Sequence, residues 1–117
     1  MGSSPPKVSI DTDLIVIGGG QAGLAAGYFL KQHGVQFQIL DAANEIGGSW
    51  QHYYHSLRLF SPARFSALPG MPFPGDPQHY PTRDEVIAYL RHYARCFALP
   101  IQLNSCVDEV SRLEKYF

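Results

Sequence analysis

A glycine-rich stretch near the amino end has the residue types and spacing of a nucleotide site. It reads Gly-Gly-Gly-Gln-Ala-Gly from Gly18 and matches the pattern Gly-x-Gly-x-x-Gly. In such a turn Gly18 permits the tight bend, Gly20 lets the backbone approach a pyrophosphate, and Gly23 lets the next helix lie close. The first amides of that helix, including those of Gln21 and Ala22, would face the phosphates with its positive dipole end. The spacing therefore predicts a dinucleotide phosphate site.

Asp41 is the second candidate binding residue. It follows the motif at about the 20-residue distance that is typical of the acid in a dinucleotide fold. At the end of a strand its carboxylate can accept hydrogen bonds from both hydroxyls of an adenosine ribose. Because its negative charge would repel a 2′-phosphate, the expected ligand at this site is FAD or NAD, not NADP.

The elements around these residues form a strand, a helix and a strand. Residues 14–17 are continuously apolar, which is typical of a parallel strand buried on both faces. Residues 21–33 have helical periodicity, and Gly34 follows where a left-handed residue ends a helix. The expected apolar face of this helix is Ala22, Ala25, Ala26, Phe29 and Leu30. Residues 35–40 predict a second strand, which completes one βαβ crossover.

A long segment without periodicity follows, from residue 47 to residue 81. It holds six of the nine prolines together with many aromatic residues. Loops of this length usually have a functional reason, and so much aromatic surface should not stay in water, so we expect the segment to pack on something. The aromatic residues concerned are Trp50, Tyr53, Tyr54, Phe60, Phe65, Phe73 and Tyr80.

A second helix is predicted over residues 83–97. Thr82 and Glu85 have the spacing of a capping box at its start, and Pro100 prevents its continuation. Its apolar side chains should cover the sheet, with Arg83, Arg91 and Arg95 on the polar face. Residues 101–103 predict a third strand, and residues 107–113 the start of a further one.

These elements predict an α/β fold, a Rossmann-like three-layer domain with an incomplete parallel sheet in the order three, two, one. Residues 1–11 are expected to be a flexible leader and residues 12–117 the domain itself. The net charge of −1 argues against a nucleic-acid partner, and no stretch is long and apolar enough for a membrane span. The expected compartment is the cytoplasm.

The cysteines and histidines predict no further chemistry. Cys96 and Cys106 are too few for a disulfide framework, and we expect both to be small buried apolar residues. His52 and His55 lack a third ligand at useful spacing, so no metal site is predicted.

A second glycine turn, Gly47-Gly48-Ser49-Trp50, makes a family resemblance specific. With the first turn and the stretches that follow, the sequence resembles the amino-terminal part of the flavin-containing monooxygenase group, particularly its bacterial flavoproteins and the plant auxin-forming monooxygenases. The stretches that carry it are Gly47 to His52, Ser61-Pro62, Pro72-Phe73-Pro74, Tyr80-Pro81-Thr82-Arg83, Tyr89-Leu90 and Tyr93-Ala94. This resemblance favours FAD over NAD as the bound cofactor.

The resemblance implies an enzyme in which a nicotinamide dinucleotide, NADPH in the complete protein, reduces FAD, and oxygen and a small-molecule substrate then react. It implies that Gly48, Ser49 and Trp50 lie near the ribityl chain and the flavin, and that Ser61 lies near the flavin ring. It assigns no catalytic acid or base to this segment, because the cofactor supplies the chemistry.

The sequence also departs from that group. It has no second turn for NADPH and no closing strand for the FAD domain, so we expect a fragment, inactive alone, whose uncovered sheet promotes self-association. Three alternatives stay open. They are the NAD-binding half of a dehydrogenase, a non-catalytic nucleotide-binding remnant, and a flavin disulfide reductase, although the last needs a redox cysteine pair near Trp50.

Overall fold

The computed structural model describes residues 11–47, 50, 57–59 and 61–111 as a small α/β fold. Its elements, in chain order, are β1 (Leu14–Ile17), α1 (Gln21–Gln32), β2 (Phe37–Leu40), the short 3₁₀ helix η2 (Ala63–Phe65), α2 (Arg83–Cys96) and β3 (Ile101–Gln102). The strands form one parallel sheet in the order β1-β2-β3. The predicted βαβ unit, third strand and strand order are confirmed.

Helix α1 packs on the sheet through two glycines and one leucine. Its buried positions are Gly23, Leu24 and Gly27, so the predicted face through Ala22 and Phe29 is wrong. A Cβ atom on Gly27 would lie 3.1 Å from Cδ1 of Ile39 in β2. Because glycine allows this close approach, the helix turns its glycine face to the strands and leaves Phe29 exposed.

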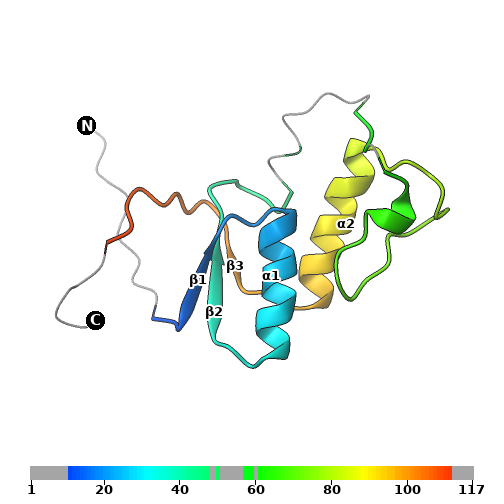
Figure 1. The fold of residues 1–117 in the computed structure, drawn as a ribbon. Coiled ribbons are helices and arrows are strands. Elements are labelled where there is room, and N and C mark those ends of the chain that lie inside the picture. Colours follow the sequence, from blue (N-terminus) through cyan, green and yellow to red (C-terminus); the bar gives the residue numbers. More distant parts are fainter. Residues whose placement is uncertain (1–10, 48–49, 51–56, 60, 112–117) are drawn as a thin grey trace, which may run out of the picture.

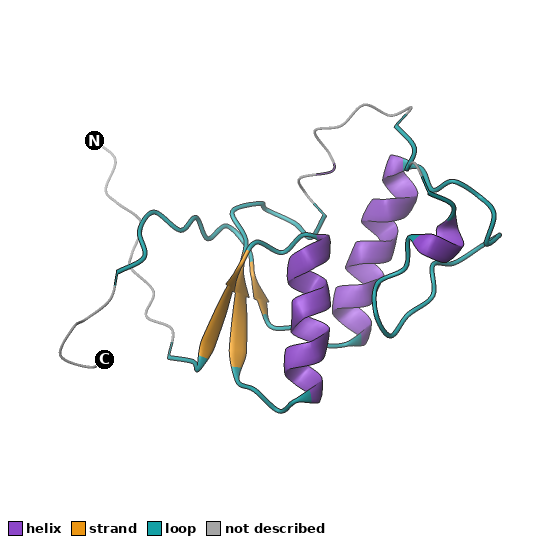
Figure 2. Ribbon diagram, in the orientation of Figure 1, coloured by secondary structure: helices purple, strands orange, loops and turns teal. Residues whose placement is uncertain are grey.

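Strand β1 is an exposed edge strand, contrary to the predicted burial on both faces. Leu14, Ile15 and Ile17 are 38, 47 and 60% exposed. The physical reason is that, among the described residues, β1 has only β2 beside it, and both α-helices lie to one side of the sheet (Figure 2).

Helix α2 begins at the predicted capping box. The Thr82 hydroxyl accepts a hydrogen bond from the N–H of Glu85, and the Glu85 carboxylate accepts one from the N–H of Thr82. The prediction that this helix covers the sheet is wrong in detail, because α1 lies between α2 and the strands (Figure 1). Its apolar residues Val86 and Leu90 still join Ile39 in one core.

The long segment after residue 47 is anchored by tyrosine side chains of α2, which the sequence did not predict. Tyr93 is fully buried and donates its hydroxyl to the carbonyl of Pro69 at 2.6 Å, and burial raises its pKa to about 12. Tyr89 donates to the carbonyl of Met71 at 2.7 Å, and Phe73 packs on its ring. The expectation that the segment packs on the domain therefore holds for its central part.

Other side chains of the segment do not follow that expectation. Phe65 and Tyr80 are exposed, and Tyr53, Tyr54 and Phe60 lie outside the described residues. The strand predicted from residue 107 does not form over the described part, residues 107–111. Cys96 and Cys106 are both exposed, which contradicts the prediction that they are buried.

Candidate functional site

The first glycine turn and Asp41 meet at the carboxyl edge of the sheet. Strands β1 and β2 pair in parallel with Ile17 opposite Leu40, so the residues that follow each strand leave the sheet side by side. The N–H of Gly18 donates to the carbonyl of Leu40 at 2.7 Å. In an open α/β sheet this edge is where ligands bind.

Each glycine of the turn has a different environment. Gly18 has a φ of +100°, a value that favours glycine. A Cβ atom on Gly23 would lie 1.9 Å from the carbonyl oxygen of Gly18, so the helix can follow the turn only with glycine there. A Cβ atom on Gly20 would meet no atom within 4 Å. The fold therefore requires Gly18 and Gly23, whereas the space beside Gly20 is open to a ligand.

The first turn of α1 offers uncapped amides. Gly20 is its N-cap and provides no side-chain hydrogen bond, and the first turn carries no acidic residue. In contrast, α2 begins with a capping box and has Asp84 and Glu85 in its first turn. The positive end of the helix dipole is therefore neutralised in α2 and left available in α1, where Gln21 and Ala22 are exposed.

The carboxylate of Asp41 organises the turn from the end of β2. Its Oδ2 accepts the N–H of Gly19 at 3.1 Å, and its Oδ1 accepts the N–H of Ala43 at 3.1 Å. A carboxylate oxygen can accept more than one hydrogen bond, so both atoms keep capacity for the hydroxyls of a ligand. The side chain is half-buried, which leaves it accessible at the same edge as the turn.

Backbone groups after β3 complete this edge, and sequence reasoning missed them. The N–H of Ser105 donates to the carbonyl of Asp41 at 2.8 Å, and that of Asn104 to the carbonyl of Ala43 at 2.9 Å. Backbone hydrogen bonds depend on strand order and not on residue type, so no sequence signal pointed to these two positions.

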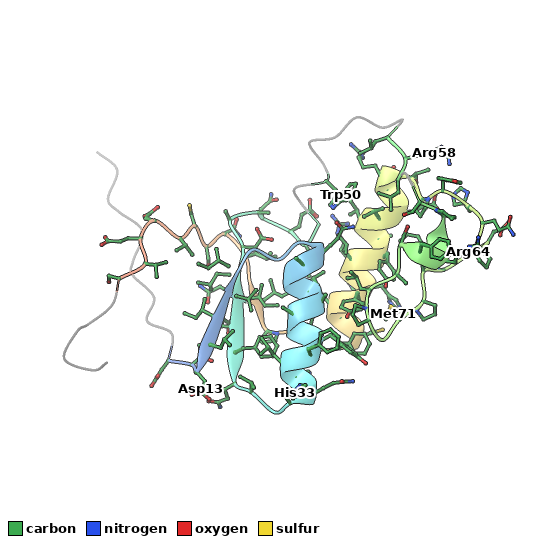
Figure 3. All side chains as sticks on the ribbon, in the orientation of Figure 1. Asp13, His33, Trp50, Arg58, Arg64 and Met71 are labelled. Carbon is green, nitrogen blue, oxygen red and sulfur yellow. The ribbon has the colours of Figure 1, made fainter. Side chains whose placement is uncertain are left out.

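The second glycine turn is described only at its ends. Gly47 has a φ of +75°, and its carbonyl accepts the N–H of Trp50 at 3.0 Å. Trp50 is half-buried and lies at the end of the domain where α1 and α2 begin (Figure 3). Gly48 and Ser49 lie outside the described residues, as do His52 and His55.

Ser61 is bonded within its own loop. Its Oγ lies 3.1 Å from Oγ of Ser66, and its carbonyl accepts a hydrogen bond from the same hydroxyl. Among the described residues, the hydrogen bonds of Ser61 stay within its own loop and none joins it to the first glycine turn, so its placement near the flavin ring stays a prediction. The described residues also contain no group of three or more potential metal ligands, and no helix long and apolar enough to cross a membrane.

With this geometry established, comparison with known proteins gives the family. The family model described as pyridine nucleotide-disulphide oxidoreductase matches residues 15–117. The chain belongs to this family. The glycine turn, Asp41 and both helices of this pyridine nucleotide-disulphide oxidoreductase segment all lie within the matched range.

Individual relatives confirm the resemblance to flavin monooxygenases. An uncharacterized CzcO-like oxidoreductase of Geobacillus kaustophilus (strain HTA426) is 50% identical over 90% of this chain and 30% of its own length. The indole-3-pyruvate monooxygenase YUCCA6 of Arabidopsis thaliana is 36% identical over 93% and 26%. The solved structure of a flavin-containing monooxygenase from Stenotrophomonas maltophilia is 51% identical, with a TM-score of 0.82, over 87% of this chain and 31% of that one. The chain thus spans less than a third of the length of each relative.

Proposed function

We propose that this chain is the FAD-binding portion of an NAD(P)H-dependent flavoprotein monooxygenase or oxidoreductase. One observation carries the proposal, namely that the open space at Gly20, the uncapped start of α1 and the Asp41 carboxylate share one edge of the sheet. Amides and a positive dipole suit a pyrophosphate, and a carboxylate that is bonded to the same glycine turn suits a ribose. These are the two parts of an adenine dinucleotide that a protein recognises in this way.

Different residues of the site would bind different parts of the cofactor. We assign the pyrophosphate to the turn of Gly18, Gly20 and Gly23 with the amides of Gln21 and Ala22, and the ribose to Asp41. When bound, FAD supplies hydride acceptance and oxygen activation, while the protein binds, orients and shields it. We assign the flavin end of the cofactor to Gly48, Ser49 and Trp50, and the neighbourhood of the flavin ring to Ser61. No residue of this chain is assigned a proton transfer.

Two features favour FAD over NAD. The second glycine turn lies soon after Asp41 and leads to Trp50, which is half-buried at the same end of the domain as the first turn. A dehydrogenase half would leave that turn and the packed segment after it without a role. The names of the relatives, flavin-containing monooxygenase and indole-3-pyruvate monooxygenase, support the same choice.

Disulfide reduction is a weaker alternative, although the family takes its name from it. That chemistry needs a cysteine pair at the flavin. The two cysteines of this chain lie elsewhere, Cys96 in the last turn of α2 and Cys106 after β3, and Trp50 ends the second glycine turn.

The remaining assignments are proposals of the same kind. We propose that residues 12–117 form the FAD domain, that the complete enzyme uses NADPH and a small-molecule substrate in the cytoplasm, and that this chain self-associates through β1. The exposed apolar residues of β1 support the last of these.

Cofactor retention is the direct test. The purified chain is incubated with FAD, passed through a desalting column and measured for visible flavin absorption, with NAD titrated in parallel. We expect retained flavin at about equimolar stoichiometry and no competition by NAD. A folded chain that retained no flavin but bound NAD would favour the dehydrogenase alternative instead.

A further inference from the structure

The connection between Asp41 and the second glycine turn is held in place from α2. Residues 42–47 follow β2 without regular secondary structure. Their first part is fixed at the sheet, where the carbonyl of Ala43 accepts the N–H of Asn104. Their last part lies near α2, because a Cβ atom on the buried Gly47 would lie 3.5 Å from Cα of Ile87.

Arg91 makes two contacts with this last part from one guanidinium group. Its Nε donates to the carbonyl of Ile46 at 3.2 Å, and its Nη2 donates to Oε2 of Glu45. The planar fork of arginine fixes the direction of both donors at once, which the single ammonium of lysine does not. Bonds to a carboxylate are also stronger than neutral ones. Arg91 therefore sets the position of residues 45 and 46 relative to α2.

We propose that Arg91 is a positioning residue for FAD. It holds the connection so that the ribose-binding carboxylate of Asp41 and Gly47, where the second glycine turn begins, keep a fixed separation. The inference rests on the proposed function, because it assumes that one ligand spans both glycine turns. It assigns a specific role to a residue that the sequence pattern had placed only on the polar face of its helix.

The next turn of α2 offers a matched control. Arg95 has the same chemistry, four residues later, and lines the same cavity of about 530 Å³ beside Glu45 and Arg91. Within the described part of the chain its guanidinium group makes no hydrogen bond or ion pair, and its backbone carbonyl accepts the N–H of Ala98. Arg95→Met therefore removes a charge from the same helix face and cavity without releasing the connection.

The affinities for two ligands of different length distinguish a positioning role of Arg91 from a general effect on stability. ADP can occupy the pyrophosphate and ribose positions only, whereas FAD needs both turns. We expect Arg91→Met to weaken FAD binding about ten-fold, as the loss of a charge-assisted contact would, and ADP binding less than about two-fold. Arg91→Lys should recover part of the FAD affinity. Arg95→Met should leave the affinity for FAD and the affinity for ADP unchanged. If Arg91→Met lost affinity equally for FAD and ADP, or lost no affinity for FAD, the inference would be overturned.

A measurement without ligand keeps this test separate from the proposed function. Trp50 is the only tryptophan of the sequence, and its N–H donates to the carbonyl of Gly47, the last residue of the connection that Arg91 holds. We expect its fluorescence emission to shift to longer wavelength in Arg91→Met and not in Arg95→Met. If the unmodified chain failed to bind FAD, the proposed function would fall while this shift still reported on the anchoring. No shift in either variant would overturn the anchoring itself.

Discussion

The carboxylate of Asp41 and the backbone N–H of Gly19 lie 3.1 Å apart and form a hydrogen bond between the end of β2 and the turn before α1. A strand-end acid in this fold is usually considered for its contact with a ribose. Here the same carboxylate also fixes the turn that would hold the pyrophosphate, because its other oxygen accepts the N–H of Ala43. Binding and local structure are therefore coupled at one side chain.

Asp41→Asn should lower both stability and FAD affinity. An amide can accept at only one of its two terminal atoms, so one of the two backbone N–H groups loses its partner, at a cost of about 1 kcal/mol. We expect FAD binding to weaken at least about ten-fold. Urea unfolding and FAD titration measure the two effects. Asp76→Asn is the control, because Asp76 accepts the N–H of Gln78 in an exposed turn outside the site, and its FAD affinity should not change.

Two glycines of the first turn should respond differently to a side chain. Gly20→Val should leave the fold intact, because a Cβ there meets no atom within 4 Å, but should abolish FAD retention by filling the ligand space. Gly23→Ala should destabilise the fold by about 3 kcal/mol or more, because its Cβ would overlap the carbonyl of Gly18. Thermal unfolding with and without FAD distinguishes them. A folded Gly20→Val that retained FAD normally would refute the site assignment.

The capping box of α2 should lose its stabilising effect at acid pH. The hydrogen bond from His79 to the Glu85 carboxylate is the largest cause that lowers the pKa of Glu85 below its ordinary 4.5, and desolvation opposes it. Since the folded-state pKa is the lower one, the contribution is complete above pH 4.5 and is lost as the pH falls through the depressed value.

Carboxyl NMR titration of Glu85 measures this pKa directly. In His79→Ala the pKa should move back up toward the ordinary value, so the stability lost on acidification should be smaller and its loss should be complete at a higher pH. Because the Glu85 side chain is 41% exposed, solvent screens the interaction and the effect on total stability should be small. An unchanged pKa in His79→Ala would mean that the Thr82 contacts alone lower it.

Self-association should depend on the exposed face of β1. We expect the chain to form concentration-dependent oligomers in sedimentation velocity, and Ile17→Lys to reduce them, because a charge on an edge strand opposes strand pairing. Val110→Lys is the control, since Val110 is 79% exposed but lies outside the sheet. A monomeric parent chain at all concentrations would contradict the prediction.

The parts of the fold that depend on local sequence could be predicted. Gly18 and Gly34 mark the turns around α1 through their positive φ, and Thr82 with Glu85 marks the start of α2 through a pair of reciprocal hydrogen bonds. Each signal is complete within a few residues, so no knowledge of the tertiary structure was required.

The parts that depend on distant neighbours could not be predicted. A run of four apolar residues is compatible with a central strand and with an edge strand. The sequence therefore does not predict the exposure of Ile15 and Ile17. The hydrophobic pattern also predicts the wrong buried face for α1, because the close approach that Gly27 allows sets the orientation of the helix on the sheet. The hydroxyl of Tyr93 found its acceptor at Pro69, far away in sequence and in a segment without periodicity.

The position of β2 in the middle of the sheet has a consequence for synthesis on the ribosome. β2 can pair with β1 as soon as the first crossover has emerged, but its other edge waits for Ile101 and Gln102, after the whole segment and α2 have been translated. Until then Ile39 has neither its β3 neighbour nor the α2 residues of its core. The nascent chain therefore carries a half-paired strand until β3 has emerged, which is the stage at which a chaperone would act.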